Sequence, residues 1–124
     1  MTKTILAWHW LKADMRSGFG GEPPWEIGET RTCSGKMSLC KNGYHHSPTP
    51  WDGLQYAPGP VLCRVEASVP VEGGETKGVS RTVTLIAARN MERELRLFAC
   101  ECAERALGHR RAVGREPDAR SWAA

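Results

Sequence analysis

The segment from Val61 to Val69 constrains the fold most, because apolar side chains occupy every second position and from Cys63 onward alternate with polar ones. Successive side chains of a strand point to opposite faces, so a period of two predicts a strand with one face in a core. Arg64, Glu66 and Ser68 occupy the other face. Pro70 and the Gly73-Gly74 pair that follow predict a turn at its end. The inward residues are Val61, Cys63, Val65, Ala67 and Val69.

Three further strands are predicted around this one. Residues 79–86 place Val79, Val83 and Leu85 on one face, and we expect them to pair antiparallel with residues 61–69 across the glycine-bearing loop. Residues 5–11, ILAWHWL, are apolar on both faces, which is typical of a central strand covered on both sides. Residues 43–46 form a short strand that leads into a helix.

Two helices complete the predicted fold. A short one covers residues 50–57, because Thr49 is suited to cap it, Pro50 suits its first turn and Asp52 completes the capping pattern. A long one covers residues 91–107 with Gly108 as its stop, and its apolar stripe is expected to lie on the sheet. The fold class is therefore α+β, with a small, mainly antiparallel sheet. We expect one domain over residues 1–108 and a basic, flexible tail over 109–124.

Composition excludes several classes of protein. The chain has 124 residues, 40% of them hydrophobic, and no apolar run near the roughly 20 residues that a membrane helix needs. Five cysteines without a CxxC pair do not suggest a disulfide framework and fit a reducing compartment. We therefore expect a protein that is cytoplasmic in whatever cell makes it and that makes no membrane contact.

A zinc site is the first chemical hypothesis, with Cys33, Cys40 and His45 as candidate ligands. Structural zinc usually takes four ligands from two closely spaced pairs, and this chain has no second pair. We therefore predict no metal and expect the cysteines to pack as small apolar residues. His45 and His46 are adjacent in a predicted strand, so we expect them to point to opposite sides and at most one to serve a site.

Partner binding is suggested by the tryptophans and by the arginines of the C-terminal segment. Arginine and tryptophan are enriched at interaction hot spots. The chain has five tryptophans, and they cannot all lie at the centre of so small a core. The C-terminal segment is rich in arginine, which also suggests contact with nucleic acid. The candidate partner-binding residues are Trp25, Trp122, Arg110, Arg111 and Arg115.

The segment CKNGYHHSPTPWDGLQYAPGPVLCRVEASV resembles a family of uncharacterised proteins encoded by phages and prophages. The resemblance rests on the pattern C-x-x-G-x-H-x-S…D-x-L-x-Y-A-P-G-x-x-L-C-x-V-E, and AWHW and LFACECAERAL extend it over about residues 5–107. Phage-like origin and small size imply an accessory protein that acts by binding. We expect an inhibitor of a host defence complex, similar to anti-CRISPR proteins, with a host protein or ribonucleoprotein as its partner.

A remoter resemblance is to ADP-ribosyltransferases of the H-Y-E class. LAWHWL resembles their first core strand, GYHHSPTPWDGLQYA their strand and helix ending in tyrosine, and VLCRVEASV their next strand. The resemblance implies NAD as cofactor, with His9 holding the nicotinamide ribose and Tyr44 or Tyr56 stacking on nicotinamide. The chain departs from that class in its late strand, VSRTVTLI, which lacks the usual glutamate; Glu66 and Glu75 are the nearest acids. An NAD-dependent transferase is therefore the alternative to a binding protein.

Overall fold

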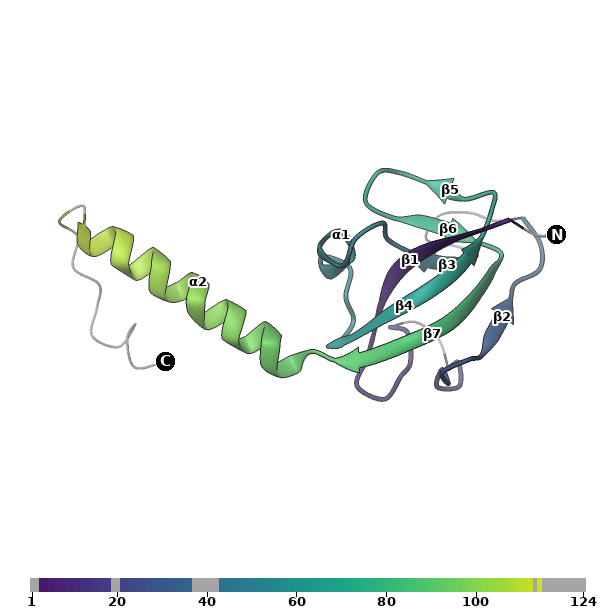
Figure 1. The fold of residues 1–124 in the computed structure, drawn as a ribbon, viewed down its shortest axis with the longest axis horizontal. Helices are drawn as coiled ribbons and strands as arrows, with labels where there is room; N and C mark the ends of the chain where they lie inside the picture. Colours follow the sequence, from purple (N-terminus) through teal and green to yellow (C-terminus); the bar gives the residue numbers. More distant parts are fainter. Residues whose placement is uncertain (1–2, 19–20, 37–42, 113, 115–124) are drawn as a thin grey trace. The chain divides into compact units, whose positions relative to one another are not determined.

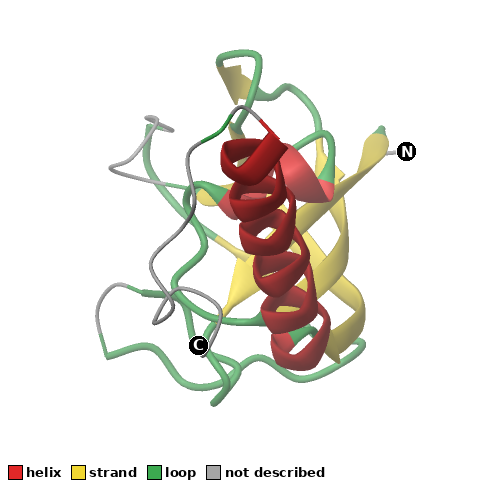
Figure 2. Ribbon diagram, turned by 90° about the vertical axis from the view of Figure 1, so that its left-hand side faces the viewer, coloured by secondary structure: helices red, strands yellow, loops and turns green. Residues whose placement is uncertain are grey.

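The computed structural model describes residues 3–18, 21–36, 43–112 and 114. They belong to two compact units, Met1–Met91 and Glu92–Ala124. The first unit holds all the described strands and one short helix, and the second is built on one long helix (Figures 1 and 2). Helices and antiparallel sheets together make the protein α+β, as the sequence predicted.

A four-stranded antiparallel sheet forms the base of the first unit, in the order β1-β4-β7-β2. Val61–Ser68 (β4) alternates as predicted, and its apolar face is buried. It pairs on one side with Thr4–Leu11 (β1) and on the other with Thr82–Asn90 (β7). Thr30–Thr32 (β2) then pairs with β7 and adds hydroxyl contacts between facing threonines, such as 2.6 Å between Thr30 Oγ1 and Thr84 Oγ1.

A second sheet has the order β3-β6-β5 and comprises Tyr44–His46 (β3), Gly78–Ser80 (β6) and Glu72–Gly73 (β5). The chain passes from this sheet into β7 through the single residue Arg81. The predicted strand 79–86 is therefore two strands in two sheets. Its pairing with residues 61–69 is confirmed for the β7 part, where Val83 faces Ala67 and Leu85 faces Val65.

The prediction of a central position for residues 5–11 is wrong. β1 is the edge strand of its sheet, and the side chains of Ile5 and Leu6 are exposed. Its two tryptophans, Trp8 and Trp10, are each covered by neighbouring groups instead of by a second layer. The Trp10 indole donates to the carbonyl oxygen of Pro50 at 3.0 Å, and the Arg64 guanidinium lies 4.3 Å from the centre of the Trp8 ring. This cover explains why the segment is apolar on both faces.

The two sheets are joined at Trp8 and Ser47, whose backbones exchange hydrogen bonds of 2.9 and 2.7 Å. The core lies on the inner face of the larger sheet and comes entirely from the first unit. Its buried members are Ala7, Leu11, Trp25, Val61, Cys63, Val65, Ala67, Val83 and Leu85.

Both helices begin within one residue of their predicted starts, but their lengths differ from the predicted ones. Pro50–Leu54 (α1) is capped as predicted, with the Asp52 amide donating to Thr49 Oγ1 at 3.1 Å. Glu92–Ala112 (α2) continues through Gly108, and the chain turns at Gly114, whose φ of 80° suits a glycine beyond a helix end. No residue of α2 is buried. The expected boundary at residue 108 falls inside this helix.

Gly59 lets the chain that follows α1 pass close to the backbone of Leu11 and Lys12 at the end of β1. Replacement of Gly59 tests this close approach. A Cβ at this position would lie 2.5 Å from Lys12 Cα and 3.0 Å from the Leu11 carbonyl oxygen, both backbone atoms. We expect Gly59→Ala to lower the free energy of unfolding by about 1–3 kcal/mol in urea titrations. Gly74→Ala is the control, because a Cβ added there would have nothing within 4 Å. Equal stability of the two variants would contradict this packing.

Candidate functional site

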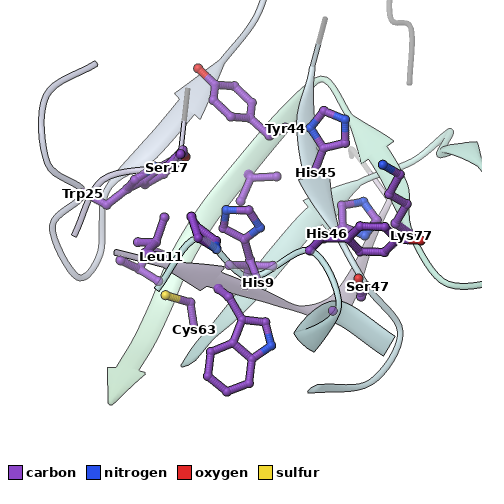
Figure 3. A pocket seen from close by; sticks show the side chains of 18 of the residues that line it. His9, Leu11, Ser17, Trp25, Tyr44, His45, His46, Ser47, Cys63 and Lys77 are labelled. Carbon is purple, nitrogen blue, oxygen red and sulfur yellow. The ribbon is translucent and has the colours of Figure 1, made fainter. Parts of the chain in front are cut away.

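A cavity of about 670 Å³ lies in the first unit. That volume is within the range of small-molecule sites. Its floor is apolar and comes from the inner face of the larger sheet, including Cys63, Val65 and Leu85. Its walls come from β3, from the end of α1 and from the loop around residues 17–25 (Figure 3).

His9 lies at the centre of this cavity (Figure 3). It projects from β1 on the same face as the core residues Ala7 and Leu11, and Cys63 is its cross-strand partner. It is half-buried, and within the described residues its ring makes no hydrogen bond. Burial, and after it the neighbouring imidazoles of His45 and His46, lower the His9 pKa to about 4, against the opposing effect of Glu22. At neutral pH the cavity therefore holds an uncharged imidazole that offers one donor and one acceptor.

His45 and His46 both line the cavity, so the prediction that at most one could serve a site is wrong. β3 has three residues, lies at the edge of its sheet, and contributes all three residues to the lining of the cavity. The buried His46 ring lies 2.8 Å from Ser80 Oγ through Nε2. Burial, followed by the effect of His45, lowers its pKa to about 4. The pKa of His45 is lowered by burial and then by Lys77.

Tyr44 and Trp25 form the aromatic wall. Their rings meet edge to face, with centroids 5.6 Å apart and an interplanar angle of 80°. Trp25 is held by its amide, which donates to the Met15 carbonyl at 2.8 Å, and the Arg31 guanidinium lies 4.1 Å from its ring centre. Trp25 is only 6% exposed, so its predicted role as an exposed partner-binding residue is wrong. Its indole nitrogen is buried and has no partner among the described residues.

Arg31 organises the loop that carries this wall. Its guanidinium donates to the carbonyl oxygens of Pro23 and Pro24 and to the Glu29 carboxylate. The Glu22 carboxylate lies 3.7 Å from Arg31 Nη1 and accepts from the Ser17 amide at 2.8 Å. One planar cation with several donors therefore holds Glu22, Pro23 and Pro24 next to the Trp25 ring.

The far wall combines Tyr56, just beyond α1, with the turn between β5 and β6. Tyr56 OH and Thr76 Oγ1 are 2.9 Å apart, and Lys77 Nζ lies 4.4 Å from the centre of the Tyr56 ring.

All three residues assigned by the transferase resemblance, His9, Tyr44 and Tyr56, line this one cavity. Sequence reasoning missed Glu22 and Lys77, which line the same cavity from irregular segments. Neither segment has a periodic pattern that could have indicated them.

Glu66 and Glu75, the acids considered for the transferase role, do not line the cavity. Glu66 on β4 accepts instead from the Thr4 hydroxyl at 2.6 Å. Among the described residues that line the cavity, Glu22 is the acid. It comes from an early loop, and its oxygens interact with Ser17 and Arg31, so its position does not correspond to a late-strand catalytic glutamate.

The remaining predicted site residues that the structure describes do not line the cavity. Cys33 is half-buried after β2, where its amide donates to the Arg81 carbonyl, and Cys40 lies outside the described residues. Within the described part of the chain, no three His, Cys, Asp or Glu side chains could together hold a metal ion. Arg110 and Arg111 are exposed in the last turn of α2, whereas Arg115 and Trp122 are outside the described residues. No described helix combines the length and apolar character needed to span a membrane.

The fold and the cavity together define a small α+β domain with a ligand-sized cavity. The chain belongs to the family described as a domain of unknown function, DUF7666, whose model matches residues 5–97. No curated protein and no solved structure matches it significantly. Because the family description names no activity, function has to be argued from the cavity itself.

The low pKa values of His9 and His46 predict acid-sensitive stability. Between about pH 7 and about pH 5 the unfolded chain binds protons on these imidazoles, whereas both stay neutral in the folded state until about pH 4. The free energy of unfolding therefore falls on acidification, by roughly 1–2 kcal/mol per histidine. Urea titrations at both pH values measure this fall, and His9→Gln should reduce it. An unchanged pH dependence in this variant would contradict the assignment.

Proposed function

We propose that this protein binds a small planar heterocyclic ligand in the cavity around His9, and that NAD or its nicotinamide half is this ligand. The observation that carries the proposal is the convergence of His9, Tyr44 and Tyr56 on one cavity from β1, β3 and the turn after α1. These are the residues to which the transferase resemblance gives roles in holding ribose and stacking on nicotinamide. Their convergence supports small-molecule binding better than it supports a purely structural role.

The chemistry of the walls also supports such a ligand. Flat aromatic rings and an apolar floor favour a planar heterocycle, and a few polar groups then fix its orientation. His9 supplies a donor and an acceptor at the centre, where its neutral ring can bond to hydroxyl or amide groups. A fixed imidazole without a described partner is a group whose hydrogen-bonding capacity a ligand can satisfy.

Binding rather than group transfer is the activity we propose. Transfer or hydrolysis at the nicotinamide ribose requires a group that stabilises the developing positive charge. Glu22 is the acid among the described lining residues, and its carboxylate already interacts with Ser17 and Arg31. Incubation of the full chain with labelled NAD and a bacterial lysate distinguishes these activities, because label transfer or NAD hydrolysis would establish an enzyme.

Isothermal titration with NAD and with nicotinamide tests the binding proposal. We expect Tyr56→Ala and His9→Gln to weaken binding about tenfold, the loss of about one good contact. Trp51→Ala is the matched control, because Trp51 is an aromatic residue of α1 that is 67% exposed and does not line the cavity. Circular dichroism verifies that each variant is folded. Absence of binding to the wild-type chain would overturn the proposal.

A second candidate is an accessory protein, encoded by a phage or prophage, that binds and inhibits a host defence complex. The observation that favours it is α2, which has no buried residue and carries Leu97 and Phe98 at 58% and 48% exposure. Exposed apolar side chains followed by Arg110 and Arg111 make a surface suited to protein or ribonucleoprotein partners. Binding to such a complex does not require the cavity, so the two proposals can be tested separately.

Purification from host extract, with the paired variants Leu97→Glu and Phe98→Glu, tests this second candidate. We expect the wild-type chain to retain a stoichiometric partner and both variants to lose it, because a carboxylate would be desolvated at an apolar contact. His9→Gln should retain the partner, since His9 lines the cavity rather than this helix. Loss of the partner in His9→Gln but not in the helix variants would contradict a role for α2.

A further inference from the structure

The cavity meets solvent at a short rim. Among the described lining residues, the exposed ones are Gly18, Tyr56 and Pro58, whereas the others are buried or half-buried. Gly18 packs closely against Pro58, because a Cβ added to Gly18 would lie 3.0 Å from Pro58 Cβ. Direct packing therefore closes that side of the rim. Tyr56 forms the other exposed part, so access to the cavity depends on what holds its ring.

Two contacts tie the Tyr56 ring to the turn between β5 and β6. Tyr56 OH and Thr76 Oγ1 are 2.9 Å apart and share one exposed hydrogen bond. Lys77 Nζ lies 4.4 Å from the centre of the ring, a distance typical of a cation–π contact. Tyr56 and Thr76 are 20 positions apart in the chain, so these contacts connect two separate segments rather than stabilise one local turn.

The two segments are anchored unequally. The segment that carries Tyr56 is fixed, because the Tyr56 amide donates to the Gly53 carbonyl at 3.0 Å and Gly59 packs against backbone at the end of β1. The turn follows β5, which has two exposed residues and is the edge strand of its sheet. A Cβ added to Gly74 would meet nothing within 4 Å. The turn is therefore the segment that moves with the smaller loss of contacts.

We propose that the turn at residues 74–77 is a gate for the cavity and that the hydrogen bond between Tyr56 and Thr76 is its latch. With the latch formed, the Tyr56 ring is held at the rim. When the turn swings away, the ring is released and small molecules reach the floor at Cys63 (Figure 3). One exposed hydrogen bond and one exposed cation–π contact are weak in water, so the gate opens without unfolding of the sheets. Access matters for any ligand, so the gate goes beyond the proposed function.

The rate at which iodoacetamide alkylates Cys63 measures access to the cavity in the full chain, without any ligand. Cys63 lines the cavity and is fully buried, so the reagent has to enter before it reacts. Peptide mass spectrometry follows this cysteine separately from the others. Tyr56→Phe and Thr76→Val each remove one hydroxyl of the latch and keep the shape of the side chain. We expect each to raise the rate about fivefold, the factor that one hydrogen bond of typical net strength gives.

A double variant and a matched control make the test specific. The chain with both Tyr56→Phe and Thr76→Val should react as fast as either single variant, because the two hydroxyls form one bond. Thr30→Val is the control, since it removes a comparable exposed hydroxyl contact, 2.6 Å from Thr84 Oγ1, at a residue that does not line the cavity. Its rate should equal that of the wild-type chain.

Three results would overturn the gate. The first is an unchanged rate in Thr76→Val. The second is a rate in the double variant that equals the product of the two single effects, because the hydroxyls would then act independently. The third is an equal increase in Thr30→Val, because alkylation would then report a general loosening of the fold. None of these measurements contains a ligand, so failure of the gate leaves the proposed binding of NAD or nicotinamide to its own titration.

Discussion

The reciprocal backbone hydrogen bonds between Trp8 and Ser47 are the constraint on which the site depends. They attach the edge of the larger sheet to the chain that leaves β3, so Tyr44, His45 and His46 lie beside His9. The chain also connects the two sheets, through residues 69–71 between β4 and β5 and through Arg81 between β6 and β7. A backbone contact of this kind is insensitive to side-chain identity, so it holds the architecture while the cavity residues remain available for binding.

The cavity combines features that are costly for stability and useful for a ligand. Three imidazoles have pKa values lowered chiefly by burial, and an aromatic wall is held by a single arginine. Burial of a polar ring without a described partner, as at His9, reduces stability unless something else bonds to it. A protein that only needed a stable core could fill this space with aliphatic side chains. The geometry is therefore better explained by a binding role than by packing.

The two proposed functions use different parts of the chain. A small ligand would occupy the cavity of the first unit, whereas a macromolecular partner would contact the exposed side chains of α2. The family model extends from residue 5 to residue 97, so it covers the elements that line the cavity and only the beginning of α2. The cavity thus lies wholly within the family domain, whereas α2 extends beyond it.

The sequence by itself determined the local elements. Alternation in Val61–Ser68 marked a strand, and the Thr49 cap marked α1, because both depend on neighbours in the chain. Through the transferase resemblance it also indicated His9, Tyr44 and Tyr56. It mistook the edge strand β1 for a central one, since Trp8 and Trp10 are covered by Arg64 and by α1 rather than by a second layer. Only the tertiary structure decided that Trp25 belongs to the core rather than to a partner-binding surface, and that Glu22 and Lys77 line the cavity. These residues lie in irregular segments whose conformations are determined by contacts between residues distant in the chain, and such contacts have no periodicity that a sequence displays.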